Sequence, residues 1–250
     1  ANLTINTDSD LDLDLVNFQT NDTNLGSGNL LVNSDELTIN TDIITTGSIT
    51  TQTLKTTTIS GGDIQTTDED ISITAGTAQF SGVDSYGVEV ENANIKTTGI
   101  GSIVINGTGG PGTGSRNIGI DLRDLASIQT QGSGSITLTG NGGTGSVLCV
   151  GIQTFSGSTI TSNTGSITLN GTSGAGTEGS SVADFGIRLN DVIQSTGGGN
   201  INLTGVSNGL GTENEDGVRI GNTTIITNGG DINILGTGST SSTLDFNQGV

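Results

Sequence analysis

Charged side chains recur at one position of a repeated pattern, two residues after a glycine that is followed by an aliphatic residue. The residues at this position are Glu89, Asp121, Gln153, Arg188 and Arg219. If the repeats stack, Glu89, Asp121, Arg188 and Arg219 form a surface charge column. Carboxylates beside arginines could act on a polysaccharide, with Arg123, Asp184 and Asp216 as neighbours. Balancing of surface charge is the alternative, and it needs no ligand.

The composition excludes the common catalytic groups. The sequence contains no histidine and a single cysteine, so the usual catalytic triads cannot form. Cys149 lies among Val147, Leu148 and Val150, which predicts a small buried side chain and no disulfide. The aromatic residues are scattered along the chain and predict no stacking surface for a sugar: Phe18, Phe80, Tyr86, Phe155, Phe185 and Phe246. We therefore expect no catalytic and no cofactor-binding residue.

The charge and hydropathy of the chain restrict its partners. The net charge is −19, from 25 acidic and six basic residues, which argues against nucleic acid because phosphates require clustered Lys and Arg. No segment approaches the roughly 18 consecutive apolar residues of a membrane span. We therefore expect neither nucleic-acid binding nor membrane insertion of this segment.

Three acidic segments are candidates for weak calcium binding: Asp8 to Asp14, Asp68 to Asp70, and Glu213 to Asp216. Calcium requires several oxygen ligands from one loop. None of the three segments matches the glycine-rich nonapeptide of β-rolls or an EF-hand loop. The sequence thus predicts no dedicated metal site.

The candidate residues belong to an internal repeat of about 32 residues. Three motifs recur with this period. The first is a glycine followed by an aliphatic residue, as at Gly87 and Gly119. The second is an isoleucine that leads into Thr, Ser or Asn and then Gly, and the third is Gly-Ser-Ile or a variant of it. The isoleucines of the second series are Ile95, Ile128, Ile160, Ile193 and Ile226. The third series predicts an internal ladder of Ile71, Ile103, Ile136, Ile167, Ile201 and Ile232, joined by Ile105, Leu138, Leu169, Leu203 and Ile234.

Each series alternates apolar and polar residues, as in a strand with one buried face. Three short strands in every period and no helical pattern predict an all-β parallel β-helix, a β-solenoid. We expect coils of about 32 residues in 71–250 and about 20 in 1–70, sharing one core in a single domain over 1–250. The additional residues of each long coil form an insert that is rich in Gly and Thr, as in Gly107 to Ser115. Such inserts should bulge from one edge without packing a core.

The Gly-Ser-Ile-Thr-Leu-Thr-Gly unit at Gly134 to Gly140, the Gly/Thr-rich inserts and the Gly-Ile-x-Leu strands resemble filamentous-haemagglutinin-like exoproteins, especially the large repeat exoproteins of cyanobacteria. The resemblance covers 71–250 well and 1–70 loosely. It implies a right-handed parallel β-helix, export to the cell surface, and an adhesive or fibre-forming role.

These observations predict a secreted bacterial cell-surface rod with a structural or adhesive role, in a filament or an extracellular matrix. Both ends of the sequence read as cuts inside a longer array, so further repeats or sister chains are expected end to end. Cell-surface glycans and other cells are further candidate partners. The alternative is a carbohydrate-active enzyme, because pectin-lyase-like enzymes also use parallel β-helices, with Asp-bound calcium and an Arg or Lys base.

Overall fold

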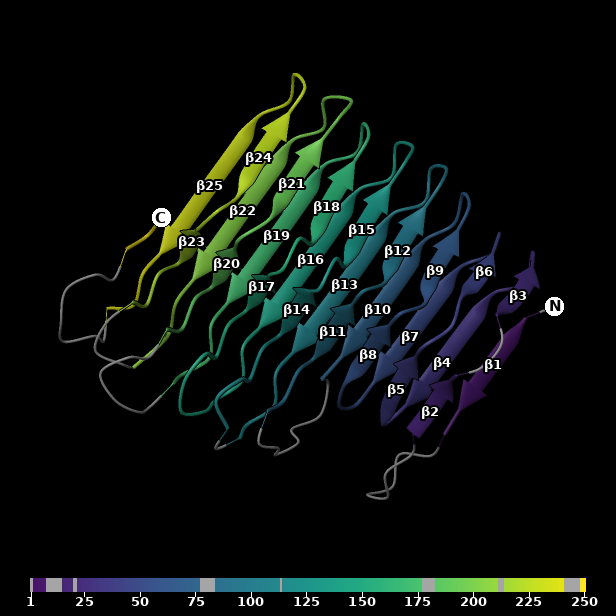
Figure 1. The fold of residues 1–250 in the computed structure, drawn as a ribbon, viewed down its shortest axis with the longest axis horizontal. Helices are drawn as coiled ribbons and strands as arrows, with labels where there is room; N and C mark the ends of the chain where they lie inside the picture. Colours follow the sequence, from purple (N-terminus) through teal and green to yellow (C-terminus); the bar gives the residue numbers. More distant parts are fainter. Residues whose placement is uncertain are drawn as a thin grey trace.

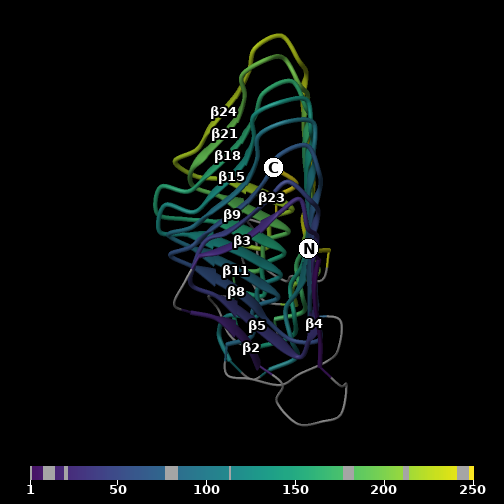
Figure 2. The same ribbon diagram turned by 90° about the vertical axis from the view of Figure 1, so that its right-hand side faces the viewer.

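The computed structural model describes residues 2–7, 15–19, 22–76, 84–112, 114–176, 183–210, 214–240 and 248–250. The described residues form an all-β solenoid without a helix, in which three parallel sheets run along the stack of coils (Figure 1). Viewed from the N-terminal end, the sheets form the sides of a triangle (Figure 2). The predicted fold class is therefore confirmed as an all-β parallel solenoid with three short strands per coil.

The described strands are distributed over three sheets, named A, B and C here. Sheet A contains β1 (Leu3–Asn6), β4 (Leu30–Ser34), β7 (Ile49–Thr53), β10 (Ile71–Ala75), β13 (Ile103–Thr108), β16 (Ile136–Asn141), β19 (Ile167–Thr172), β22 (Ile201–Val206) and β25 (Ile232–Thr237). Sheet B contains β2 (Leu15–Phe18), β5 (Glu36–Ile39), β8 (Thr57–Ser60), β11 (Val88–Glu91), β14 (Ile120–Arg123), β17 (Ile152–Thr154), β20 (Ile187–Leu189) and β23 (Val218–Ile220). Sheet C contains β3 (Thr23–Gly26), β6 (Ile43–Thr45), β9 (Asp63–Thr66), β12 (Asn94–Thr97), β15 (Ser127–Thr130), β18 (Thr159–Ser162), β21 (Val192–Ser195) and β24 (Thr224–Thr227).

Coil length differs between the two halves of the stack. Leu30 pairs with Ile49 and Ile49 with Ile71, which are the predicted short coils of 19 and 22 residues. From Ile71 onward the coils have the predicted length near 32, as in the pairing of Ile71 with Ile103. The first coil is longer than expected, because Leu3 pairs with Leu30.

The predicted ladder lies inside sheet A, with every pair in register. Its members from Ile71 to Leu203 are fully buried. Ile232 and Ile234 keep the register but differ in burial. Ile232 is 43% exposed and Ile234 is partly buried, because β25 is the last described strand of the sheet. The ladder is therefore confirmed, except that solvent reaches its C-terminal members.

The predicted series that ended in Ile226 is wrong by one residue. In sheet C, Ile193 pairs with Ile225, while Ile226 pairs with Gln194 and is 46% exposed. Successive side chains of a strand point to opposite faces, so a shift of one residue moves Ile226 outside. Two adjacent isoleucines in β24 made both alignments possible in the sequence.

The long coils contain pairs of glycines where the chain leaves sheet A and later enters sheet B. A Cβ atom built on Gly140 would clash with the carbonyl oxygen of Gly151, and Gly107 stands in the same relation to Gly119. Comparable contacts join Gly171 to Gly186 and Gly205 to Gly217. The two ends of these four inserts therefore touch at a neck that has no room for a side chain, whereas the first long coil has Ala75 at the aligned position.

A second, smaller core lies at the returning ends of the inserts, C-terminal to their Gly- and Thr-rich segments. Ile118, Val150 and Phe185 are buried against each other, and Tyr86 and Leu148 pack on them. Four of these five residues, all except Leu148, directly precede the glycine of the Gly-aliphatic pair. The returning end of each insert thus covers part of the outer face of sheet B.

Candidate functional site

The predicted charge column exists and lies on the outer face of sheet B. Its members pair in register from Glu89 to Asp121, Gln153, Arg188 and Arg219. The column changes from acidic at β11 and β14 to basic at β20 and β23. Parallel pairing without a bulge is what brings five residues from five different coils into one line.

The acidic half is not on the surface, which corrects the prediction of a surface column. Asp121 is 2% exposed and Glu89 is 9% exposed. Both lie on the sheet face that the returning ends of the inserts cover. Burial raises the pKa of each carboxyl group, because a carboxylate loses hydration there.

Arg123 neutralises the acidic half. Its Nη2 lies 2.5 Å from Glu89 Oε1 and 3.5 Å from Glu91 Oε2, and its Nη1 lies 3.7 Å from Asp121 Oδ2. Burial lowers the pKa of Arg123, but the three carboxylates outweigh burial and raise it. The predicted pairing of Arg123 with Asp121 is therefore confirmed, although Glu89 is the nearer partner.

Arg188 begins the basic half and is held by aromatic rings. Its guanidinium carbon lies 5.9 Å from the centre of the Phe155 ring and 5.7 Å from that of Phe185. Its Nη1 donates a hydrogen bond of 3.3 Å to Gln153 Oε1. Burial, and then the neighbouring Arg219, lower the pKa of Arg188. No carboxylate of the described residues forms an ion pair with it.

Arg219, in contrast, has a carboxylate partner. Its Nη1 lies 3.4 Å from Asp216 Oδ2 and 3.5 Å from Asn214 Oδ1. Its guanidinium also lies over the Phe185 ring, 5.2 Å from the ring centre. The predicted neighbour Asp216 therefore pairs with Arg219. The other predicted neighbour, Asp184, is fully buried and accepts the N–H groups of Cys149 and Gly176.

A pocket of about 140 Å³ lies where the acidic and basic halves meet. Asp121, Gln153 and Arg188 line it from sheet B, together with Arg116, Ile118, Arg123, Leu148 and Phe155. Arg116 lies on an insert, and the neighbouring Tyr86 and then Asp84 raise its pKa. All four arginines of the sequence therefore lie on this one face of the molecule. An arginine-rich pocket with an aromatic wall can bind an anionic group.

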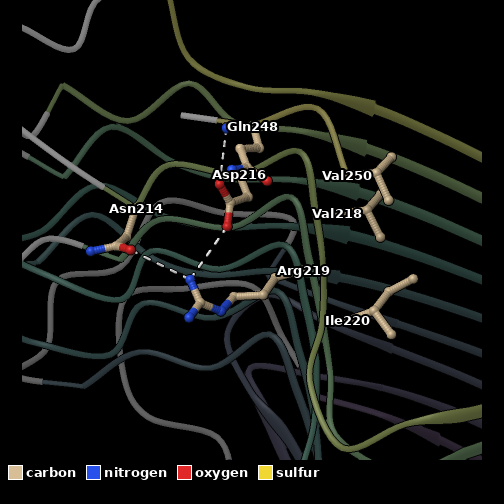
Figure 3. Close-up of a pocket in the computed structure, with 7 residues that line it drawn as sticks. All are labelled: Asn214, Asp216, Val218, Arg219, Ile220, Gln248 and Val250. Carbon is tan, nitrogen blue, oxygen red and sulfur yellow. Dashed lines mark hydrogen bonds and ion pairs between the residues drawn. The ribbon is translucent and has the colours of Figure 1, made fainter. Parts of the chain in front are cut away.

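A second, more open pocket of about 470 Å³ lies on the last described coil (Figure 3). Its polar lining is Asn214, Asp216, Arg219 and Gln248, and its apolar lining is Val218, Ile220 and Val250. Asp216 Oδ1 accepts the Gln248 N–H at 3.0 Å, and Oδ2 faces Arg219. The charges of this pocket thus neutralise each other.

The calcium candidates have other roles or lie outside the described residues. Asp68 accepts the backbone N–H of Ile100, and Asp70 accepts that of Ser102 at 2.7 Å. Asp8, Asp10, Asp12 and Asp14, as well as Glu213, are outside the described residues. In the part of the chain that the structure describes, no three His, Cys, Asp or Glu side chains group in a way that could hold a metal ion.

Cys149 is buried, as its apolar neighbours predicted. Burial, and then the nearby Asp184, raise the pKa of its thiol to about 12. The thiol therefore stays protonated near neutral pH and is a poor nucleophile.

Sequence reasoning missed the aromatic residues and Arg116. The spacing of the aromatic residues predicts no cluster, yet Tyr86 lies beside Arg123, Phe155 beside Arg188, and Phe185 beside Arg219. Tyr86 and Phe185 directly precede the glycines of the repeat, and this position was the available signal. Phe80 and Phe246 are outside the described residues.

Among the described residues, no helix is long and apolar enough to cross a membrane. No family model matches the chain, and neither a curated protein nor a solved structure matches it.

Proposed function

We propose that the chain is a rod segment of a secreted bacterial surface protein with a structural or adhesive role. The observation that supports this proposal is the continuity of the core, because the same inward columns run through every coil from Leu30 to Leu203. Each coil buries its apolar face against its neighbours, so the stack gains stability with length. At about 4.8 Å per coil, such a stack spans distance and keeps a constant cross-section.

The two end faces supply the surface for further repeats or sister chains. At the C-terminal face the inward-facing Ile232 is 43% exposed, and at the other end the inward-facing Leu3, Ile5 and Val16 are only partly buried. Strands at the end of a parallel stack present unpaired N–H and C=O groups, which another strand can pair. Cell-surface glycans and other cells are proposed as lateral partners, which would meet the faces of the rod.

A carbohydrate-active enzyme is the second candidate, and one observation favours it. Asp121, Arg123 and Arg188 line the same pocket, as an enzyme with a carboxylate and a base would require. Two observations weigh against it. Asp121 is 2% exposed, and Arg123 is surrounded by three carboxylates, which hold its proton. We therefore rank binding above cleavage.

Two experiments separate these functions. The full chain, displayed on a bacterium that does not adhere, should increase attachment or cell–cell aggregation relative to cells that display a globular protein of similar size. The purified chain should release no new sugar ends from acidic or neutral polysaccharides. Release of such ends, abolished by Asp121→Asn, would establish the enzyme instead. Equal attachment of both kinds of cell would count against the adhesive role.

A further inference from the structure

We propose that the pocket beside Arg188 binds a sugar that carries a carboxylate, such as a uronate unit of an acidic polysaccharide. The inference rests on the proposed adhesive role and names a ligand class for it. It depends on three features of the pocket: a cation that forms no ion pair with the described residues, an exposed aromatic wall, and a partly exposed amide that can hydrogen-bond to hydroxyl groups.

The first feature is the charge on Arg188. The four arginines of the chain share one face, but three of them face acidic groups: Arg123 has Glu89, Glu91 and Asp121, Arg219 has Asp216, and Arg116 lies by Asp84. Arg188 is partly buried and makes, with the described residues, a single hydrogen bond to Gln153. A guanidinium has five N–H donors, so most of those on Arg188 remain available. A carboxylate can accept two of them at once.

The second feature is the aromatic wall. Phe155 lines the pocket and is 46% exposed, although exposure of a phenyl ring to water is unfavourable. Phe185 is buried, and its ring makes the second aromatic contact with the Arg188 guanidinium. The two rings restrict the guanidinium, so little side-chain entropy is lost on binding. The apolar C–H face of a pyranose ring would cover the exposed Phe155 ring.

The third feature restricts the ligand further. Asp121 and Gln153 line the same pocket and are linked by a hydrogen bond of 3.1 Å from Gln153 Nε2 to Asp121 Oδ1. Asp121 is 2% exposed, so its charge disfavours a bare anion without contacting the ligand, whereas the partly exposed Gln153 amide can hydrogen-bond to hydroxyl groups. A neutral sugar lacks a partner for Arg188, and a simple anion lacks hydroxyl groups for Gln153. A sugar with one carboxylate satisfies both groups, and a volume of about 140 Å³ suits a single ring.

Titration calorimetry of the full chain with glucuronate, glucose and acetate tests the proposal. Glucuronate should bind with a dissociation constant in the millimolar range, and glucose and acetate at least tenfold more weakly. Arg188→Gln should weaken glucuronate binding by at least tenfold, because a charged hydrogen-bonded pair is lost. Arg219→Gln is the matched control, one coil away and outside the pocket lining, and it should change binding less than twofold.

Circular dichroism and the melting temperature establish that both variants are folded. Binding of acetate as tight as that of glucuronate would overturn the sugar class, and unchanged binding by Arg188→Gln would overturn the site. Phe155→Ala offers a second test at an exposed position and should weaken glucuronate binding without lowering the melting temperature. If glucuronate fails to bind but displayed cells still attach, the inference fails and the adhesive role stands.

Discussion

The short coils between Leu30 and Ile71 and the long coils that follow share one triangular core. They differ because only the long coils have inserts, which cover part of the outer face of sheet B. At one inward position of sheet A the short coils carry Ser34 and Thr53, β10 carries Ala75, and each following strand carries glycine. Ser and Thr side chains fit there in the short coils, a methyl group fits in β10, where the first long coil begins, and the later long coils have no side chain there. The comparison teaches that the core needs no insert, and that the long coils restrict this position to alanine or glycine.

The two regions also differ in the content of the core. Sheet A aligns Thr51 of the short coils with Val32 before it and Ile73 after it, and all three are buried. Thr53 and Thr57 lie together inside the short coils, with their hydroxyl groups 3.0 Å apart. The long coils place isoleucine, leucine and valine at most inward positions and put their buried charges on the outer face of sheet B. The long coils thus keep buried Thr and Ser inside sheet C, at Thr97, Thr130, Ser162 and Ser195, and add buried charges beneath the inserts.

The largest expected effect comes from breaking the ladder of the long coils. Ile167→Asp should destabilise the chain by several kcal/mol, because it places an unpaired charge where Ile167 is fully buried. Urea unfolding followed by circular dichroism measures the loss. Thr168→Asp, one residue further on the outer face, is the control and should change stability by about 0.5 kcal/mol or less. Equal effects of the two variants would contradict the assigned faces.

A smaller effect should separate the glycine neck from the short coils. Gly140→Ala should destabilise by about 1–3 kcal/mol, because the added Cβ overlaps the carbonyl oxygen of Gly151. Ala75→Gly makes the opposite substitution at the aligned position of β10 and should lower the free energy of unfolding by about 1 kcal/mol or less. Thermal unfolding of both variants gives the comparison. If Gly140→Ala were as stable as the parent, the neck would not be closed.

The threonines inside the short coils predict effects of opposite sign. The Thr51 hydroxyl is buried and forms no hydrogen bond with described residues, so Thr51→Val should stabilise by about 1 kcal/mol. The Thr45 hydroxyl, in contrast, is hydrogen-bonded to the Gly26 and Gly28 carbonyls and the Gly47 N–H, so Thr45→Val should destabilise by about 1–2 kcal/mol. Denaturant midpoints of the two variants should move apart. A shift in the same direction would refute this distinction.

The smallest expected effect concerns pH. The pKa values of Glu89 and Asp121 are raised in the folded state, so the folded chain binds their protons at a higher pH than the unfolded chain does. These two groups should therefore add stability as the pH falls from 7 towards the ordinary values of 4.5 and 3.8. The melting temperature of the parent should gain more over this range than that of Asp121→Asn. Parallel pH profiles would show that Asp121 is not buried.

Periodic residues allowed most of the fold to be predicted from the sequence. Ile103, Ile136 and Ile167 recur with glycine before them, and parallel pairing turns this period directly into a stack. Ile225 and Ile226 show the limit, since neighbouring isoleucines fit the period equally and only the pairing partner decides between them.

The candidate site was predicted less completely. The order of the charge column followed from the repeat, but the burial of Asp121 did not, because the cover comes from inserts of variable length and low apolar content. Arg116 also lies on an insert, outside every repeated strand, so no period could place it. Such contacts depend on how a glycine-rich segment returns to the sheet, which local pattern does not determine.

The glycine neck has a consequence for engineering. Gly171 and Gly186 enclose a longer segment than Gly140 and Gly151 do, yet the two ends meet in the same way. Segment length and coil geometry are therefore decoupled, and lengthening a closed loop adds only a small entropy term. A foreign peptide grafted between such a glycine pair should be carried at a fixed spacing along the stack, which makes this architecture a scaffold for ordered arrays of grafted sequences.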